Sequence, residues 1–393
     1  MTLTFEDARA CVLRNGRLGT ETEPVCLLEA SGRVLSEPVV ADRDYPPFHR
    51  SARDGFSVRA ADLPGALRIA GEVRAGDAFH APLQPGEAVE IMTGAPLPAG
   101  ADAVVMVEHT ARDGDRVRID RTLQSGDNFT PQGTEARAGE VVLSPGRRLG
   151  FAEIAALAMV GRECVNVYRK PRVSILPTGD EIVEAGERPK PFQIRNSNAL
   201  SLAAQVMRAG GEPAILPIAR DNYESTRSAI ERGLQADLLL LSGGVSAGKY
   251  DIVEKVLADV GAEFFFDRVK IQPGQPLVYG AVQGTQFFGL PGNPASTMVT
   301  FEVFARAAVE LLAGANEALL PLLRAKLSSD FRHKPGLTRF LPAAVSADGT
   351  TVAPVAWHGS GDIAALARAN AFLVAEADRE TWEAGEDIRV LLK

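Results

Sequence analysis

Residues 237–260 read DLLLLSGGVSAGKYDIVEKVLADV, and the rest of the fold can be built outward from this stretch. Its four consecutive leucines, Leu238 to Leu241, predict a strand buried on both faces, as in a parallel sheet covered by helices. A glycine-rich loop follows at 242–248, and Asp251 begins a helix whose apolar residues share one face. This strand, loop and helix predict a connection at the carboxyl edge of an open sheet, where free backbone N–H groups suit an anion.

The glycine-rich loop nearly matches two catalytic motifs. Gly243, Gly248 and Lys249 fall one residue short of a nucleotide-binding P-loop, because Tyr250 stands where that motif has Ser or Thr. The loop also fits the GxSxG nucleophile elbow of serine hydrolases, with Ser246 as the nucleophile. The histidines that such a hydrolase needs lie in a region predicted to be a separate β domain, so this alternative is the weaker. By itself, the loop is equally compatible with an anion-binding turn and with a turn that only packs helix on strand.

Composition narrows the class of protein. The chain has 393 residues, which is too long for one hydrophobic core, and a net charge of −8, which disfavours nucleic acid or a membrane surface as the main partner. Its three cysteines show no CxxC spacing, so neither a disulfide framework nor a zinc site is indicated. No run of 18 apolar residues occurs. We therefore expect a protein that is not exported and works in the cytoplasm.

The pattern along the chain predicts an α/β and β multidomain protein. A central, doubly wound α/β domain is expected at 171–319, where strands and helices alternate. Short strands separated by glycine and proline predict an inserted antiparallel β domain at 46–139 and a C-terminal β domain at 320–393. The flanking pieces 1–45 and 140–170 are expected to form one discontinuous N-terminal domain.

Carboxylates follow several strands of the predicted central sheet. Five strands are predicted there, and each ends in a polar or glycine-rich loop: 173–176, 214–219, 238–241, 264–266 and 287–290. The acidic residues after them are Asp180, Glu181, Asp221 and Asp251. Since parallel strands end at one sheet edge, folding should gather these carboxylates although they are far apart in sequence. Carboxylates this close repel one another unless a cation offsets their negative charge, and Mg²⁺ held beside substrate phosphates is the usual cation.

Seven motifs in order make the chain resemble a known family. They are PPFHRSARDGFSV, IMTGAPLPAGADAVVM, PRVSILPTGDEI, SGGVSAGKYD, PGQP, GLPGNPAS and HGSGDIAALARANA. These motifs resemble those of the molybdopterin molybdenumtransferase family, which is similar to the C-terminal domain of gephyrin. The resemblance implies a four-domain, dimeric enzyme that inserts molybdenum from molybdate into adenylylated molybdopterin and releases AMP with the help of Mg²⁺. It also implies a molybdopterin adenylyltransferase as the substrate donor, and a non-catalytic, dimeric pterin-binding or scaffold protein as the alternative.

The resemblance also implies roles for individual residues. Those carried over as catalytic are Asp54, Thr93, Glu135, Glu181, Asp221 and Asp251, with Glu181 and Asp251 as the Mg²⁺ ligands. The residues predicted to bind substrate are Gly243, Gly244, Ser246, Arg268, Lys270, Gln272, Asn293, Arg339 and Ser360, of which Arg339 and Ser360 match substrate-contacting positions of the family.

Some of these residues depart from the family pattern. Glu135 stands where the family usually has aspartate, and Gln272 stands where it often has lysine. We expect Arg268 and Lys270 to supply the positive charge that is lost. The hypothesis is that the glycine loop cradles pterin or phosphate, that the carboxylates position Mg²⁺ and an attacking oxygen, and that Thr93 and Arg339 orient molybdate or phosphate. We also expect the site to be completed across a dimer interface.

Overall fold

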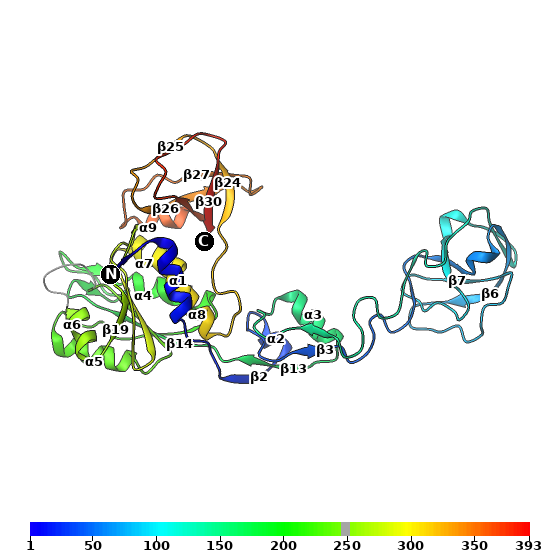
Figure 1. Ribbon diagram of the computed structural model, residues 1–393, viewed down its shortest axis with the longest axis horizontal. Coiled ribbons are helices and arrows are strands. Elements are labelled where there is room, and N and C mark those ends of the chain that lie inside the picture. Colours follow the sequence, from blue (N-terminus) through cyan, green and yellow to red (C-terminus); the bar gives the residue numbers. More distant parts are fainter. Residues whose placement is uncertain (245–251) are drawn as a thin grey trace. The chain divides into compact units, whose positions relative to one another are not determined.

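The structure, a computed structural model, describes residues 1–244 and 252–393 (Figure 1). The described residues form two compact units. Unit 1 comprises residues 1–36, 146–150 and 165–393, and unit 2 comprises residues 37–145 and 151–164. The four-domain division made from the sequence stays a prediction.

A six-stranded sheet is the centre of unit 1. Its strands, in spatial order, are β17 (Glu212–Ile215), β14 (Arg172–Pro177), β18 (Leu238–Ser242), β23 (Thr285–Leu290), β22 (Val278–Val282) and β19 (Glu263–Phe266). The first four are parallel to one another. Strand β22 is antiparallel to both of its neighbours, so β19 runs in the same direction as the first four. The carboxyl ends of five strands therefore meet at one edge.

Helices cover both faces of this sheet, as the leucine run predicts. Leu238 and Leu240 pack in a core with α1 (Phe5–Asn15), α4 (Asn198–Arg208) and α7 (Pro294–Thr300). Leu239 and Leu241 pack in the opposite core with α5 (Tyr223–Gly233) and α6 (Ile252–Asp259), and Figure 1 shows these two helices on their own side of the sheet. All four leucines are 0% exposed, and each contributes about 1.5–3 kcal/mol by leaving water. The central domain is therefore doubly wound, as predicted.

The sequence analysis missed strand β22. It forms a hairpin with β23, and the two turn residues, Gln283 and Gly284, both have positive φ (49° and 87°). Such a turn matches the right-handed twist of paired strands. Two strand-like runs separated by two residues were the available signal. The predicted strand 214–219 also ends early, at Ile215, although Ala219 still forms a parallel bridge to Thr178.

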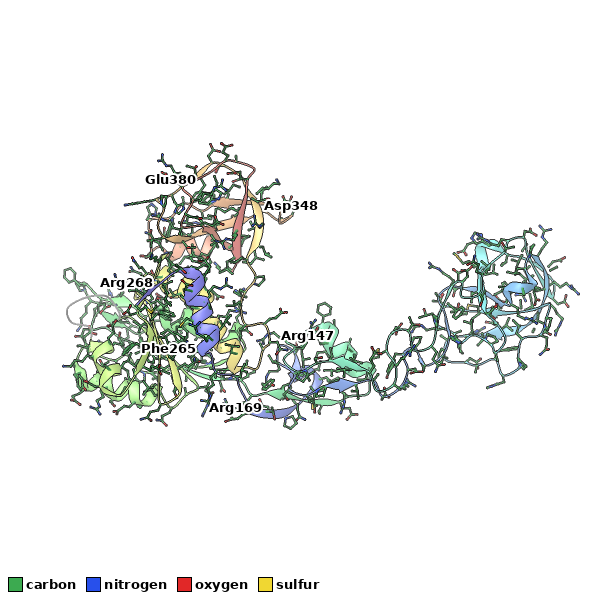
Figure 2. The ribbon with its side chains drawn as sticks, viewed as in Figure 1. Arg147, Arg169, Phe265, Arg268, Asp348 and Glu380 are labelled. Carbon is green, nitrogen blue, oxygen red and sulfur yellow. The ribbon has the colours of Figure 1, made fainter. Side chains whose placement is uncertain are left out.

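An arginine fixes the start of strand β18. Asp237, which directly precedes the leucines, accepts hydrogen bonds from both terminal nitrogens of Arg169, each at 3.0 Å, and from the backbone N–H of Arg172 at 2.7 Å. Figure 2 labels Arg169 at the edge of this unit. The paired charge lowers the pKa of Asp237 even though burial acts in the opposite direction.

A small closed sheet forms the C-terminal part of unit 1. Strands β26 (Thr338–Val345), β27 (Thr351–Pro354), β24 (Leu323–Leu327), β30 (Asp387–Leu392) and β28 (Ala371–Ala375) pair in this order, and β28 pairs with β26 again. Strand β21 (Ile271–Gln272), which lies between β19 and β22 in sequence, pairs with β26. The shorter elements elsewhere in unit 1 are β1 (Thr2–Leu3), β2 (Thr22–Cys26), α2 (Leu27–Ala30), β13 (Cys164–Tyr168), β15 (Ile182–Val183), β16 (Ile194–Arg195), β20 (Arg268–Val269), β25 (Phe331–Arg332), α9 (Ile363–Arg368) and β29 (Thr381–Trp382).

Unit 2 contains a second six-stranded sheet, with the order β8 (Ala103–Met106), β5 (Gly55–Val58), β7 (Glu87–Ile91), β6 (Gly65–Val73), β10 (Arg116–Ile119) and β9 (Ala111–Asp113). The antiparallel prediction was wrong for one pair, because β6 and β7 are parallel. The connection from 74 to 86 has the length that such a crossover needs. The unit also holds β3 (Val39–Val40), β4 (Arg50–Ser51), β11 (Phe129–Thr130), β12 (Val141–Leu143) and α3 (Phe151–Met159). Among the helices of the described residues in either unit, none is long and apolar enough to cross a membrane.

A buried charge cluster stabilises the long helix after β23. This helix consists of α7, a π-helical turn (Phe301–Ala305) and α8 (Arg306–Leu312). Arg306 donates to Glu302 at 3.2 Å and to Glu310 at 3.3 Å, and the three side chains are only 10%, 4% and 8% exposed. Arg148 also forms an ion pair with Glu310. Neutralisation is essential here because a charge left alone in the interior is strongly destabilising.

We expect Arg306→Met to lower the free energy of unfolding of unit 1 by about 3–5 kcal/mol, because two buried carboxylates lose their shared partner. Both tryptophans of the chain, Trp357 and Trp382, lie in unit 1, so urea unfolding followed by tryptophan fluorescence reports on this unit. The matched control is Arg227→Met, which breaks an exposed ion pair on α5 and should cost less than about 1 kcal/mol. Equal losses in the two variants would contradict a stabilising role for the cluster.

Candidate functional site

A cavity of about 780 Å³ lies at the carboxyl ends of β14, β18 and β23. The polar residues that line it include Thr178, Glu181, Asn198, Asp221, Ser242 and Asn293. Adjacent strand ends are joined by backbone hydrogen bonds, from Thr178 N to Ser242 O at 3.1 Å and from Gly243 N to Leu290 O at 3.2 Å. The cavity therefore opens where the topology of an open α/β sheet places ligand sites.

Carboxylates gather at one wall of this cavity. The backbone N–H of Asp180 donates to the Asp221 carboxylate at 3.3 Å, and the N–H of Asp221 donates to the Asp180 carboxylate at 3.4 Å. Glu181 and Asp221 both line the cavity. A Cβ on Gly179 would lie 2.5 Å from the Glu181 carboxylate, so only glycine allows this carboxylate to fold back there. Asp251, the fourth acid of the predicted cluster, lies outside the described residues.

The glycine turn after β18 is tightly constrained. Gly243 and Gly244 have φ of +97° and +66°, a region that favours glycine. A Cβ on Gly243 would lie 2.8 Å from Thr178 O, and one on Gly244 would lie 2.7 Å from a Val253 methyl carbon. The turn thus exposes backbone, not side chain, to the cavity. Ser246 of the predicted loop lies outside the described residues, as do Lys249 and Tyr250 of the partial P-loop match.

The amino end of α4 supplies residues that sequence reasoning missed. Asn198, the first residue of α4, donates from Nδ2 to Ser242 Oγ at 3.0 Å and to Gly292 O at 2.8 Å. Asn196, which precedes the N-cap residue Ser197, accepts the N–H of Ala199 through its side chain. The run RNSN at 195–198, directly before an apolar helical pattern, was the available signal.

The predicted residues of unit 2 form two hydrogen-bonded pairs. Asp54 Oδ1 accepts the backbone N–H of Thr93 at 2.6 Å and its hydroxyl at 2.8 Å. These two bonds, the backbone bond first, hold the pKa of Asp54 below its ordinary value. Glu135 forms an ion pair with Arg50 at 2.8 Å. All four side chains are partly or fully exposed.

The predicted basic residues Arg268 and Lys270, with Gln272, lie in the segment that connects β19 to β22 of the central sheet. Arg268, Lys270 and Gln272 alternate along an extended segment, and β20 within it pairs with the amino-terminal strand β1 (Figure 2 labels Arg268). Gln272 lies opposite Arg339 in the β21–β26 pair. These four residues are not among those lining the cavity, and the Arg339 Nε is buried without a partner in the described part of the chain.

The last two predicted residues, Asn293 and Ser360, are both found near the start of α7. Asn293 lines the cavity and is the N-cap residue of α7. The backbone oxygen of Ser360 accepts the N–H of Ala295 at 2.9 Å, so the C-terminal sheet region contacts the start of α7.

Metal ligands are sparse in the described residues. Over residues 1–244 and 252–393, no group of three or more His, Cys, Asp or Glu side chains is arranged to hold a metal ion. The two carboxylates that share the cavity, Glu181 and Asp221, are nevertheless suitable donors for Mg²⁺, which prefers one or two carboxylates together with substrate phosphates.

Family models match nearly the whole chain in three consecutive regions. The N-terminal region of MoeA, domains I and II, matches residues 3–161. A probable molybdopterin binding domain matches residues 174–311, which include every residue named above as lining the cavity. The C-terminal region of MoeA, domain IV, matches residues 324–393.

Individual relatives agree with these models. A molybdopterin molybdenumtransferase of Bacillus subtilis is 35% identical over 386 residues, which cover 95% of this chain and 90% of the relative. One from a Nostoc species is 36% identical and covers 94% of this chain and 88% of its own length. The crystal structure of the molybdopterin biosynthesis moeA protein from Pyrococcus horikoshii OT3 superimposes with a TM-score of 0.84 at 28% identity, covering all of both chains. The chain therefore belongs to the molybdopterin molybdenumtransferase family.

Proposed function

We propose that this chain inserts molybdenum into adenylylated molybdopterin with release of AMP, the last step of molybdenum cofactor biosynthesis. The observation that carries the proposal is the cavity at the sheet edge, which is lined both by a side-chain-free glycine turn and by two carboxylates, Glu181 and Asp221. Relatives of the chain over nearly its whole length are named molybdopterin molybdenumtransferase, which makes the chain an enzyme of this family.

The reaction explains why the cavity combines these groups. Cleavage of the phosphoanhydride breaks the bond between the AMP phosphorus and the bridging oxygen. An incoming oxygen bonds to the AMP phosphorus, and the molybdopterin phosphate leaves with the bridging oxygen and its electron pair. Both substrates are anionic, so the carboxylates alone would repel them. Mg²⁺, held by Glu181 together with Asp251, would neutralise charge on the phosphate oxygens. Asp221 is held by backbone hydrogen bonds to the Asp180 segment and is suited to orient the incoming oxygen.

Positive and polar groups complete the proposal. Gly243 and Gly244 present backbone to the substrate, and Asn293 lines the same cavity. Arg268 and Lys270 attract molybdate or phosphate in place of the lysines that the family often has, and Arg339 with Ser360 contributes from the C-terminal sheet region. The retained carboxylates favour this enzyme over a non-catalytic pterin-binding scaffold, because a scaffold has no use for a charge cluster that must be offset.

We further propose a cytoplasmic homodimer that receives its substrate from a molybdopterin adenylyltransferase. Light scattering should give a mass about twice the 41.8 kDa of the chain. A mass equal to that of one chain at assay concentrations would contradict the dimer. The participation of Asp54 and Thr93 across a dimer interface stays a prediction, and full activity in a verified monomer would exclude it.

Glu181→Gln should reduce AMP release from adenylylated molybdopterin in the presence of molybdate and Mg²⁺ by about 10²-fold or more, because a charged group beside the reacting phosphates is lost. The variant should also need more Mg²⁺ for half-maximal activity. The matched control is Glu184→Gln, an exposed carboxylate three residues further along that does not line the cavity. If Glu181→Gln released AMP within about twofold of the wild-type rate, with an unchanged urea midpoint, this residue would have no part in the reaction.

Thr93→Val should raise the pKa of Asp54 towards its ordinary value, because one of the two hydrogen bonds that stabilise the carboxylate is lost. The backbone bond from residue 93 remains, so the shift should be partial. In the wild type the depressed pKa keeps Asp54 ionised to lower pH, and the variant should protonate it at higher pH. Carbon-13 NMR titration of the carboxyl groups measures this. The pKa of Asp348, lowered by Ser346 and Thr350, should not change. An unchanged Asp54 titration would show that the Thr93 hydroxyl does not stabilise the carboxylate.

A further inference from the structure

Two polar atoms at the cavity have no hydrogen-bond partner among the described residues. One is the hydroxyl oxygen of Thr178, a residue only 3% exposed, and the other is the side-chain oxygen of Asn198. Both residues line the cavity. A buried polar atom without a partner is destabilising, so its persistence points to a ligand that supplies the missing bond.

The orientation of the Asn198 amide is determined by its neighbours. A backbone carbonyl oxygen can only accept, so the atom 2.8 Å from Gly292 O must be the amide nitrogen. The same nitrogen lies 3.0 Å from Ser242 Oγ. Because both bonds hold the nitrogen, the remaining oxygen can act only as an acceptor. Its missing partner is therefore a donor.

Because the Asn198 side-chain oxygen can only accept, its partner is not one of the anionic groups of the substrates. Phosphate and molybdate oxygens carry lone pairs and no protons at neutral pH, so they would repel the Asn198 oxygen. An N–H group, in contrast, can donate a hydrogen bond to this oxygen. The Thr178 hydroxyl can donate or accept, and it lies under the glycine turn, where a Cβ on Gly243 or Gly244 would come within 3.1 or 2.9 Å of it. The hydroxyl is therefore buried beside the backbone of this turn, and a side chain on either glycine would crowd it.

We propose that Asn198 and Thr178 bind the hydrogen-bonding edge of the pterin ring. The amino and ring N–H groups of a pterin lie side by side and can donate to Asn198, while the neighbouring ring atoms pair with the Thr178 hydroxyl. This inference rests on the proposed function and adds which part of the substrate the Thr178–Asn198 wall recognises. The match to a probable molybdopterin binding domain covers both residues.

The decisive variant is Thr178→Val, which keeps the side-chain shape and removes the hydroxyl. Binding of a phosphate-free reduced pterin and of AMP is measured separately by calorimetry. We expect the Kd for the pterin to rise about 5–10-fold and the Kd for AMP to stay within about twofold. Thr178→Ser, which restores a hydroxyl, should bind the pterin with a Kd close to that of the wild type. In turnover, KM for adenylylated molybdopterin should rise with little change in kcat, because this contact is made equally in the ground and transition states.

Thr226 supplies a matched control. It lines the same cavity and is 2% exposed, but its hydroxyl already donates to Arg220 O at 3.3 Å. Thr226→Val should therefore leave the pterin Kd within about twofold. Asn198→Ala is a second test variant, read together with its urea midpoint because Asn198 also joins two strand ends. It should weaken pterin binding at least as much as Thr178→Val.

The outcomes separate this inference from the proposed function. An unchanged pterin Kd in Thr178→Val overturns the inference. A variant that binds AMP more weakly but the pterin normally also overturns it, because the two residues would then belong to the adenine site. A wild-type chain that binds no pterin overturns it as well. If pterin binding depends on Thr178 but the wild type releases no AMP with molybdate present, the inference stands and the molybdenum insertion fails. If AMP is released and Thr178→Val leaves KM unchanged, only the inference fails.

Discussion

The burial of strand β18 on both faces is the constraint on which the site depends. Four leucines without exposure require helices on each side of the sheet, and they hold the strand at its centre between β14 and β23. The strand can then end only at the sheet edge, where backbone bonds join Ser242 to Thr178 and Gly243 to Leu290. That one strand end positions three features of the site: the glycine turn, the carboxylates after β14 and the amino end of α4.

The same arrangement separates two chemical tasks within one cavity. Carboxylates lie along the loops after β14 and towards Asp221, where a cation is needed before any anion can approach. Neutral amide and hydroxyl groups lie around Ser242, where an uncharged heterocycle can be held without a counter-ion. A substrate that joins a pterin to phosphates has this division of polarity. Because both kinds of group line the same cavity, they can orient it without any covalent attachment to the protein.

Sequence reasoning succeeded where a rule of topology links distant residues. Parallel strands end at one edge, so Glu181 and Asp221 could be expected together although helix α4 and strand β17 lie between them in the chain. It failed where the partner is reached only through tertiary packing. Nothing local to Asn198 shows that its amide will bond to Ser242 and Gly292, which are 44 and 94 residues away. Strand β22 was missed for a simpler reason, because its Gln-Gly turn lacks the asparagine or aspartate that usually marks such hairpins.

The pairing of β21 with β26 has a consequence for how this chain can vary. Gln272 lies opposite Arg339, and the next residue, Phe340, is 0% exposed and packs against Phe5 of α1. Side chains alternate between the two faces of a strand, so deleting one residue ahead of Arg339 would turn a guanidinium into the core and a phenyl ring into water. This junction therefore tolerates exchange of one side chain for another far better than any change in its length.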